Sequence, residues 1–557
     1  MFGESKTLVE ALEWIPRRPG RGLRFVSADG LERFYTYAEV WQEALRRAAH
    51  LAAHGLRRGD RLALVIPEGH EFVLAFLGAA VAGIVPVPIF PIATFKRIEG
   101  YADIVGHIVE AAGSRVLLTM ERMKPHMDRI FGRAACLDRL LLTETAFDGA
   151  EPSFQRPAID PGAVCFLQFT SGSTTKPRGV MVTHANLVAN ARACLGPHGL
   201  KINDDDIAVS WLPLYHDMGL GFVFASLIGD VPTVFLPTAS FARTPRIWLE
   251  AMQKYRGTIT YAPNFAYQLV TKRLREKDLD ELDLRHIRVA GCGAEPIRAR
   301  TLLDFAQRLG PTGFDGGKVL LPCYGMAEST LAIAFHELGS PIVLDRVDAD
   351  AMKLGDARRA TTETMRILEL VSCGKPFPGH ELAIVGEHGQ LLGDRKVGEI
   401  TVSGPSVTKG YYNNPDATAE SWKDGWLYTG DLGYTVDGNL YVCGRIKDLI
   451  IINGANHYPQ DIEWVVGDID RVRRGNVVAF GVMDDGVEEL IVVVEGNSGD
   501  ALELRTAIAQ KISEEYGLQP RHVSIVPVGT LPKTSSGKVQ RRKTRQMFEN
   551  GELPEHE

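Results

Sequence analysis

The chain has 557 residues, with 62 lysines and arginines against 69 aspartates and glutamates and a formal net charge of −7 at pH 7. This length exceeds that of a typical domain, so we expect at least two hydrophobic cores. The negative charge removes any global electrostatic attraction to nucleic acid or to an anionic membrane, and a polyanionic ligand would need cations placed locally.

Cysteine usage and hydropathy exclude further classes of protein. The seven cysteines are scattered without a CxxC pair, which indicates neither a disulfide framework nor a zinc site and favours a reducing compartment. The N-terminus is charged from its fourth residue and lacks an apolar signal core. The most apolar stretch, 72–85, ends against Pro86 and is shorter than the ~20 residues of a spanning helix. We therefore expect a cytoplasmic protein with no membrane span.

In chain order, short β-branched runs alternate with helical stretches. RLALVIP at 61–67 predicts a buried strand followed by a helix at 72–85, and AVCFLQF at 163–169 predicts another strand. PTVFLP at 232–237 precedes apolar residues at helical spacing, Trp248, Leu249 and Met252. Such alternation is typical of α/β proteins with parallel sheets.

The stretch FTSGSTTKPRG, residues 169–179, contains hydroxyls and glycines with two cations. We interpret it as a strand-to-helix loop between strand 163–169 and an amphipathic helix from about Thr183. Small residues let the backbone approach an anion, and hydroxyls, Lys176 and Arg178 add donors for phosphate oxygens. The alternative is a solvated Ser/Thr turn. The stretch does not match the Walker pattern GxxxxGK[ST].

Four later stretches place polar groups beside glycine turns at strand ends: LPLYHDMGL (212–220), CYGMAEST (323–330), WLYTGDLG (426–433) and GRIKD (444–448). Singly, each has a structural explanation. Tyr324 could lie in a core, Asp431 could cap a turn, Glu328 could balance a helix N-terminus, and His216 could be a buried histidine. Their fixed order, with the hydroxyl loop before them and PKTSSGK (532–538) after them, indicates a shared function.

A domain boundary is predicted near 445, where the charged segment RIKD (445–448) separates two predicted strands. Beyond it, strands at 477–482 and 490–496 and a helix near 502–516 predict a small α+β domain. Its tail at 531–545 carries six basic residues and no acidic one. A nucleic-acid patch is the alternative for this tail, but it has no interleaved aromatic residue.

These six motifs closely resemble those of the adenylate-forming superfamily of acyl and aryl ligases, luciferases and peptide-synthetase adenylation domains, over nearly the whole chain. The resemblance implies an α/β fold with a large multi-subdomain N-terminal domain (1–444), whose β-sheets are flanked by helices. It also implies a hinge at 445–448 and a small mobile α+β domain at 449–557. The implied reaction uses ATP and Mg²⁺ to convert a carboxylate into an acyl adenylate, with release of pyrophosphate.

The resemblance also assigns roles to residues within the motifs. The β- and γ-phosphates would be held by Thr170, Ser171, Gly172, Ser173, Thr174 and Lys176. The adenosine would be bound by Gly293, Ala294, Glu295, Tyr324, Gly325, Met326, Ala327, Asp431 and Arg445. Among these, Tyr324 would stack on adenine and Asp431 would accept the ribose hydroxyls. Glu328 would hold Mg²⁺ and Lys538 would be the catalytic lysine, because the reaction needs charge neutralised at a polyanionic centre.

The acyl site is predicted from residues near two of the motifs. An apolar groove would be lined by Met218, Gly219, Leu220, Asn264 and Phe265. His216 would orient the carboxylate, or it could simply cap a helix. The aromatic residues at 261–267 could equally belong to the core. A medium- or long-chain fatty acid is what the resemblance implies.

Two features resemble fatty acyl-AMP ligases in particular. Forty residues, 331–370, separate YGMAEST from VSCGKPFPG, and the run HYPQDIE follows at 457–463. In that family such an insertion is taken to restrict rotation about the hinge, here Lys447 and Asp448, so the adenylate passes to the phosphopantetheine arm of a holo acyl carrier protein instead of to CoA. The alternatives are a tolerated surface insertion in a fatty acyl-CoA ligase, a luciferase-like oxygenase, and a non-catalytic nucleotide-binding regulator. Glu328 and Lys538 are both present, which argues against the last of these.

Overall fold

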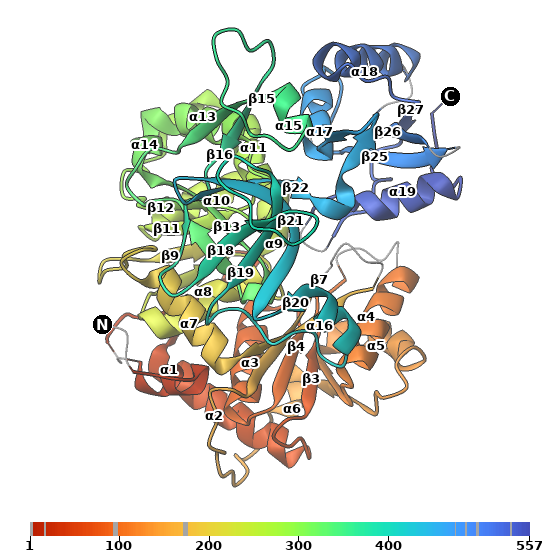
Figure 1. Ribbon diagram of the computed structural model, residues 1–557. Helices are drawn as coiled ribbons and strands as arrows, with labels where there is room; N and C mark the ends of the chain where they lie inside the picture. Colours follow the sequence, from red (N-terminus) through yellow and green to blue (C-terminus); the bar gives the residue numbers. More distant parts are fainter. Residues whose placement is uncertain are drawn as a thin grey trace.

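The structure is a computed structural model that describes residues 4–15, 18–92, 98–170, 176–473, 475–484, 487–496, 501–534 and 537–556. It has an α/β architecture of several sheets flanked by helices, with a small C-terminal domain (Figure 1), as the resemblance predicts. Within these ranges, no helix is both long enough and apolar enough to cross a bilayer.

The largest sheet is parallel through its middle and antiparallel at both edges. Parallel neighbours require crossover connections, which helices supply here. Its strands follow the order β17 (Lys375–Pro376), β14 (Ala332–Phe335), β13 (Leu320–Gly325), β12 (Val289–Cys292), β11 (Ile259–Ala262), β9 (Ala208–Ser210), β10 (Thr233–Phe235), β1 (Gly22–Val26) and β2 (Glu32–Thr36).

A second, fully parallel sheet lies nearer the N-terminus, with the order β4 (Val85–Pro88), β3 (Arg61–Leu64), β5 (Val116–Thr119) and β6 (Arg139–Leu142). The predicted strand at 61–67 and helix at 72–85 correspond to β3 and to α3 (Gly69–Val81).

The hydroxyl-rich stretch belongs to a hairpin, which corrects one prediction. Strand β7 (Val164–Thr170) pairs antiparallel with β8 (Arg178–Thr183), so the loop joins two strands and does not lead directly into a helix. Helix α7 (His184–Leu195) begins only after β8, where Thr183 caps it. Residues 171–175 lie outside the described residues.

A third sheet has the order β18 (Glu381–Val385), β19 (Gly398–Ser403), β21 (Trp426–Val436) and β20 (Trp422–Lys423), with β22 (Asn439–Arg445) also paired to β21. The stretch 331–370 contributes β14 to the largest sheet and then forms a separate antiparallel pair, β15 (Leu344–Asp348) with β16 (Ile367–Val371). Helix α15 (Ala349–Lys353) follows β15.

The remaining helices before residue 445 flank these sheets (Figure 1). They are α1 (Leu8–Trp14), α2 (Tyr37–Ala53), α4 (Ile98–Ala112), α5 (Lys124–Phe131), α6 (Thr143–Ala146), α8 (Asp217–Gly229), α9 (Thr238–Arg243), α10 (Arg246–Lys254), α11 (Asn264–Arg273), α12 (Glu276–Asp280), α13 (Ala299–Leu309), α14 (Gly316–Val319) and α16 (Pro415–Ser421).

The small domain follows the single turn η5 (Ile446–Asp448), which is where the sequence predicts a hinge. It contains the pair β23 (Ile450–Ile452) and β24 (Ala455–His457), and the sheet β25 (Val477–Asp484), β26 (Val487–Glu495) and β27 (His522–Val526). Its helices are α17 (Pro459–Gly467), α18 (Ala501–Tyr516) and α19 (Arg541–Glu549). Two apolar clusters are made only of residues after 449, so this part of the chain has its own core. The strands predicted at 477–482 and 490–496 and the helix near 502–516 are confirmed as β25, β26 and α18.

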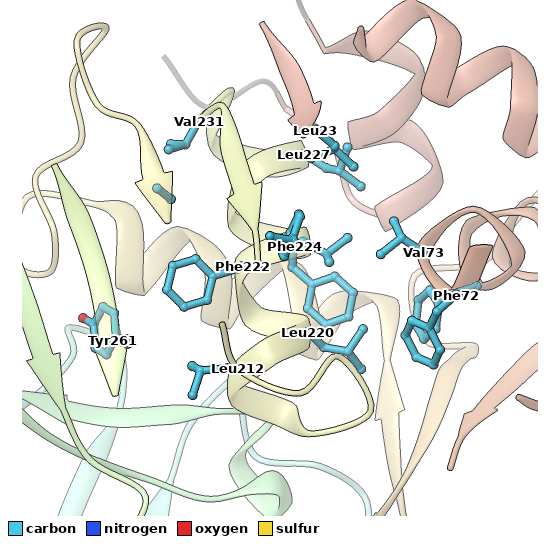
Figure 2. Close-up of a cluster of buried hydrophobic side chains, with 14 of the residues drawn as sticks. Leu23, Phe72, Val73, Leu212, Leu220, Phe222, Phe224, Leu227, Val231 and Tyr261 are labelled. Carbon is cyan, nitrogen blue, oxygen red and sulfur yellow. The ribbon is translucent and has the colours of Figure 1, made fainter. Parts of the chain in front are cut away.

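Helix α8 lies at the centre of the larger core and is apolar on all sides, as expected of a buried helix. Figure 2 shows Leu220, Phe224 and Leu227 of this helix directed toward Phe72 and Val73 of α3. The same view shows Phe222 on another side of the helix, facing Tyr261 of β11. The two sides of α8 therefore serve different purposes, one packing against α3 and the other facing β11.

Acidification is expected to destabilise the fold through His184, the first residue of α7. This side chain is buried, and its Nδ1 accepts a hydrogen bond from the backbone N–H of Leu8 at 3.3 Å. Burial lowers the pKa of His184 to about 4. The unfolded chain takes up a proton at a pKa of about 6.5, so stability falls as the pH drops from there toward 4, by about 2 kcal/mol at pH 5.

Urea unfolding at pH 7 and pH 5 measures this effect in the wild type and in His184→Asn, whose amide keeps an acceptor but does not titrate. The difference in unfolding free energy between the two proteins should shrink by that amount at pH 5. An equal difference at both pH values would contradict the assignment.

Candidate active site

One cavity of about 2150 Å³ lies between the larger part of the chain and the small domain, and residues of both line it. Most residues predicted from the motifs contribute to its wall. Those on the wall are Thr170, His216, Met218, Asn264, Phe265, Ala294, Glu295, Tyr324, Gly325, Met326, Ala327, Glu328, Asp431, Arg445, Lys447, Asp448 and Lys538.

A hydrogen-bonded group connects three strands, β13, β21 and β22. The hydroxyl of Tyr324, on β13, donates to Oδ2 of Asp431, on β21, at 2.7 Å. The other carboxylate oxygen of Asp431 accepts from Nε of Arg445, at the end of β22, at 3.0 Å. The Asp431 carboxylate raises the pKa of Arg445, which stays charged. The predicted trio is thus brought together, with the aromatic ring and the carboxylate both on the cavity wall.

Glu328 sits in the turn η4 (Ala327–Ser329) directly after β13 and is buried. Its Oε1 accepts a hydrogen bond from the hydroxyl of Tyr411 at 2.8 Å. Burial raises the pKa of Glu328, although the Tyr411 hydrogen bond and the charge of Arg445 oppose this shift. A bound cation would favour the charged form of such a carboxylate.

Lys538 crosses from the small domain into the cavity of the larger part of the chain. Its ammonium donates a hydrogen bond to the backbone carbonyl of Ala294, a residue with a positive φ of 67°. Loss of hydration lowers the pKa of Lys538, while the nearby carboxylates of Glu295 and Asp217 oppose that shift. The lysine is therefore a cation placed inside the site by residues that are distant in sequence.

Two carboxylates lie near this ammonium, and their pKa values are shifted in opposite directions. Burial raises the pKa of Glu295, and the charge of Lys538 opposes this rise. Oε1 of Glu295 accepts a hydrogen bond from the backbone N–H of Phe265, at the start of α11, at 2.6 Å. For Asp217 the burial penalty is outweighed by His216 and Lys538, so its pKa lies below the usual range. His216 Nδ1 is 2.6 Å from Oδ1 of Asp217. His216 therefore faces the cavity in an orientation set by Asp217.

Several predicted residues lie elsewhere. Gly219 and Leu220 are not on the cavity wall, because α8 turns them toward the core; a Cβ at Gly219 would lie 2.0 Å from the carbonyl oxygen of Pro213. Gly293 is also off the wall, with its Cα facing the Cys323 thiol. Lys176 is exposed. Ser171, Gly172, Ser173 and Thr174 lie outside the described residues.

The sequence reasoning missed several wall residues. Tyr411 follows no motif, and only its contact with Glu328 across the fold reveals it. Arg178, which was expected to donate to phosphate oxygens, lies on the same wall with its guanidinium 5.3 Å from the centre of the Tyr411 ring. On α8, Gly221, Phe222 and Ala225 continue the wall that begins at Met218. Helical periodicity from Met218 could have indicated this set, because positions three or four apart share a face.

Known proteins match this chain over almost its full length. The profile of the family described as AMP-binding enzyme matches residues 13–412, and that of the Disco-interacting protein 2-like AMP domain matches residues 447–557. A long-chain-fatty-acid–AMP ligase of Mycobacterium bovis is 33% identical over 534 residues, covering 91% of this chain and 90% of the relative. A relative named as an acyl-CoA synthetase, from Caulobacter vibrioides, is 35% identical over 555 residues, covering 98% and 96%.

A solved structure from a study of fatty acyl-adenylate ligases of E. coli and L. pneumophila superposes with a TM-score of 0.94. It is 36% identical and covers 99% of both chains. The chain therefore belongs to the family of AMP-binding enzymes and is an ATP-dependent adenylate-forming ligase.

Proposed function

We propose that this enzyme activates a medium- or long-chain fatty acid with ATP and Mg²⁺, forming an acyl adenylate and pyrophosphate, and then transfers the acyl group to the phosphopantetheine thiol of an acyl carrier protein. The observation that carries the first step is the meeting of Lys538 with the Tyr324–Asp431–Arg445 group in one cavity. The cavity continues from there along apolar side chains of α8.

In the first step a carboxylate oxygen of the fatty acid attacks the α-phosphorus, and the bond to pyrophosphate breaks. Anionic groups approach one another, so catalysis requires positioning and neutralisation of charge. Lys538 supplies a cation on a flexible stem, and His216, held by Asp217, faces the same region. Asp431 has a carboxylate on the wall that would accept hydroxyls of the ribose.

Mg²⁺ would be held by Glu328 together with oxygens of the nucleotide. Among the described residues, no three histidine, cysteine, aspartate or glutamate side chains converge on one point. Mg²⁺ is commonly bound by one or two carboxylates plus substrate phosphates and waters, so a single buried carboxylate beside the nucleotide site fits it. The ion would neutralise phosphate charge.

Relatives and the cavity wall support a fatty acid as the substrate. The wall beyond Met218 is mainly apolar, through Phe222 and Ala225, as is usual where the ligand is a hydrocarbon chain. One relative is the long-chain-fatty-acid–AMP ligase of M. bovis. Another is a medium-chain-fatty-acid–[acyl-carrier-protein] ligase of Moorena producens, which is 32% identical over 542 residues that cover 94% of this chain and 91% of the relative.

Contacts between the segment 331–370 and the small domain support a carrier protein as acceptor. Arg366 donates to the backbone carbonyl of Glu515 at 2.8 Å, and Lys353 donates to that of Tyr516 at 3.4 Å. Tyr458 of the small domain is buried in one cluster with Val347 and Met352 of the segment. Figure 1 shows α15 beside α17. These contacts would hold the small domain against rotation about η5, a motion that such enzymes use between half-reactions.

The runner-up is a fatty acyl-CoA ligase, which is favoured by the acyl-CoA synthetase from C. vibrioides among the relatives. In that case the contacts of 331–370 would form and break freely during turnover. Because the two functions share the adenylation site, only the acyl acceptor separates them.

The proposal is tested by incubating the purified enzyme with ATP and a fatty-acid panel, with and without Mg²⁺, CoA or a holo carrier protein, and resolving the products by chromatography. We expect Mg²⁺-dependent acyl-AMP that loads the carrier protein and leaves CoA largely unacylated. Efficient acyl-CoA formation would reject the carrier-protein acceptor, and absence of acyl-AMP would reject the fatty acid substrate.

The double variant Lys353→Ala/Arg366→Ala in the same assay tests the role of the segment. Acyl-CoA formation should rise because the small domain is held less firmly. Arg358→Ala is the matched control, since the Arg358 ion pair with Asp348, at 2.6 Å, stays within the segment.

Removal of the Lys538 ammonium should suppress adenylate formation. We expect Lys538→Ala to lower the rate of acyl-AMP formation by roughly 10²–10³-fold, the usual effect of losing one group that stabilises transition-state charge. Burial lowers the pKa of Lys538, so the ammonium loses its proton as the pH rises toward the ordinary lysine pKa. The wild-type rate should therefore begin to fall before that pH is reached. Lys511→Ala, which removes a lysine from an exposed ion pair with Glu515 in the same domain, should keep the wild-type rate. A near-normal rate in Lys538→Ala would remove this residue from the mechanism.

A further inference from the structure

A buried tyrosine on the acyl side of the cavity has a hydroxyl without a partner among the described residues. Tyr261 lies on β11, is 8% exposed and lines the cavity. Its hydroxyl makes no hydrogen bond to any of the described residues. Buried hydroxyls in proteins nearly always have a partner, so an exception needs an explanation.

The ring of Tyr261 is fixed in place by its neighbours. It lies across Gly291 of the adjacent strand β12, where an added Cβ would be 2.0 Å from the Cε1 atom of the ring. Phe222 packs at a ring distance of 6.1 Å and Phe335 at 6.0 Å. Figure 2 shows Tyr261 beside Phe222, and among the labelled side chains its oxygen is the one polar atom. The hydroxyl therefore cannot turn away to find another partner.

The polar groups around this hydroxyl are already engaged. The thiol of Cys194 donates to Oδ1 of Asn190 at 3.7 Å, and the thiol of Cys323 donates to the carbonyl of Cys292 at 3.3 Å. Both cysteines lie on the cavity wall. Burial raises the pKa of Tyr261 well above its usual value. The hydroxyl thus stays neutral and remains able both to donate and to accept a hydrogen bond.

The position of Tyr261 along the cavity identifies which part of a substrate it would meet. The carboxylate end is marked by His216 and Lys538, near the start of α8. Phe222, which packs on Tyr261, is four residues beyond Met218, or about 6 Å along the helix axis. The hydroxyl therefore faces the interior of the acyl chain and not the reacting carboxylate.

We propose that Tyr261 determines specificity by hydrogen-bonding an oxygen atom carried on the acyl chain, so that the preferred substrate is a hydroxy- or oxo-substituted fatty acid and not an unsubstituted one. This inference rests on the proposed activation of a fatty acid. A site that presents a buried polar group discriminates strongly against an analogue that leaves the group unpaired.

A second carboxylate on the chain does not fit this part of the cavity. Among the described residues, the wall near Tyr261 consists of uncharged side chains: Cys194, Phe222, Ala225, Ile259, Cys323 and Phe335. The charge of Arg288 acts on Tyr261 from behind this wall, but Arg288 is already paired with Asp206 at 2.5 Å. A carboxylate buried there would lose its hydration without gaining an unpaired cation on the wall. The oxygen that Tyr261 binds is therefore a neutral one.

The test measures kcat/KM for acyl-AMP formation by the full-length enzyme over a set of acids of equal length. The set contains the unsubstituted acid, acids with one hydroxyl placed at successive carbons, and the terminal dicarboxylic acid. We expect at least one hydroxylated acid to exceed the unsubstituted acid roughly tenfold or more, and the dicarboxylic acid to be poorer than both.

Tyr261→Phe should reduce this preference to near unity. The matched control is Tyr267→Phe: Tyr267 is buried off the cavity wall, and its hydroxyl donates to the carbonyl of Gly291 at 2.7 Å. Tyr267→Phe should lower the Tm, because it removes this buried hydrogen bond, and it should keep the preference. If the role of Tyr261 were purely structural, Tyr261→Phe would change the Tm but not the ratio of kcat/KM between hydroxylated and unsubstituted acids.

Efficient activation of unsubstituted acids, with no preference at any carbon, would overturn the role of Tyr261 and leave the proposed function intact. A preference that survives in Tyr261→Phe would overturn it as well. Absence of acyl-AMP from every acid would overturn both proposals, and the wild-type panel alone decides this even if the variant does not fold.

Discussion

The hydrogen bond between the Lys538 ammonium and the Ala294 carbonyl joins two parts of the chain that have separate cores. With this bond formed, a cation stands beside Asp217 and Glu295 in a cavity that excludes much of the water. Electrostatic interactions are stronger there than at the surface. The other features of the site depend on this placement, because the small domain thereby adds a cation to a wall on which the larger part of the chain supplies Asp217 and Glu295.

The apolar helix α8 connects that charged centre to the acyl path. Its N-terminal residues His216 and Asp217 face the reacting groups, one side carries Met218, Phe222 and Ala225 along the cavity, and the opposite side packs on α3. A helix packed in this way against α3 has little freedom to shift, so the reacting end and the acyl path keep a fixed spacing. A fixed spacing is what allows a single hydroxyl, that of Tyr261, to distinguish one carbon of a substrate from the next.

Much of this arrangement could be predicted from local sequence, and the exceptions have physical causes. Tyr324, Asp431 and Arg445 lie in motifs that the resemblance assigns to one nucleotide site, so their meeting could be expected. In the structure Asp431 is paired with Arg445 across the antiparallel strands β21 and β22, and Tyr324 reaches them from another sheet. Leu220 was predicted on the acyl wall because it is close to His216 in sequence, but each helical residue turns about 100° from the last. Strand β8 was missed because RGVMVT is short and leads directly into α7. The Tyr411–Glu328 contact and the position of the Tyr261 hydroxyl arise from tertiary packing, which no local pattern encodes.

A crystal structure of the full-length enzyme with a non-hydrolysable acyl-adenylate analogue tests the central claim most directly. The account predicts that Lys538 stays inside the cavity, with its ammonium within hydrogen-bonding distance of the oxygens at the acyl–phosphate junction, while the adenosine contacts Asp431 and Tyr324. A bound analogue with the small domain turned away and Lys538 in solvent would contradict it.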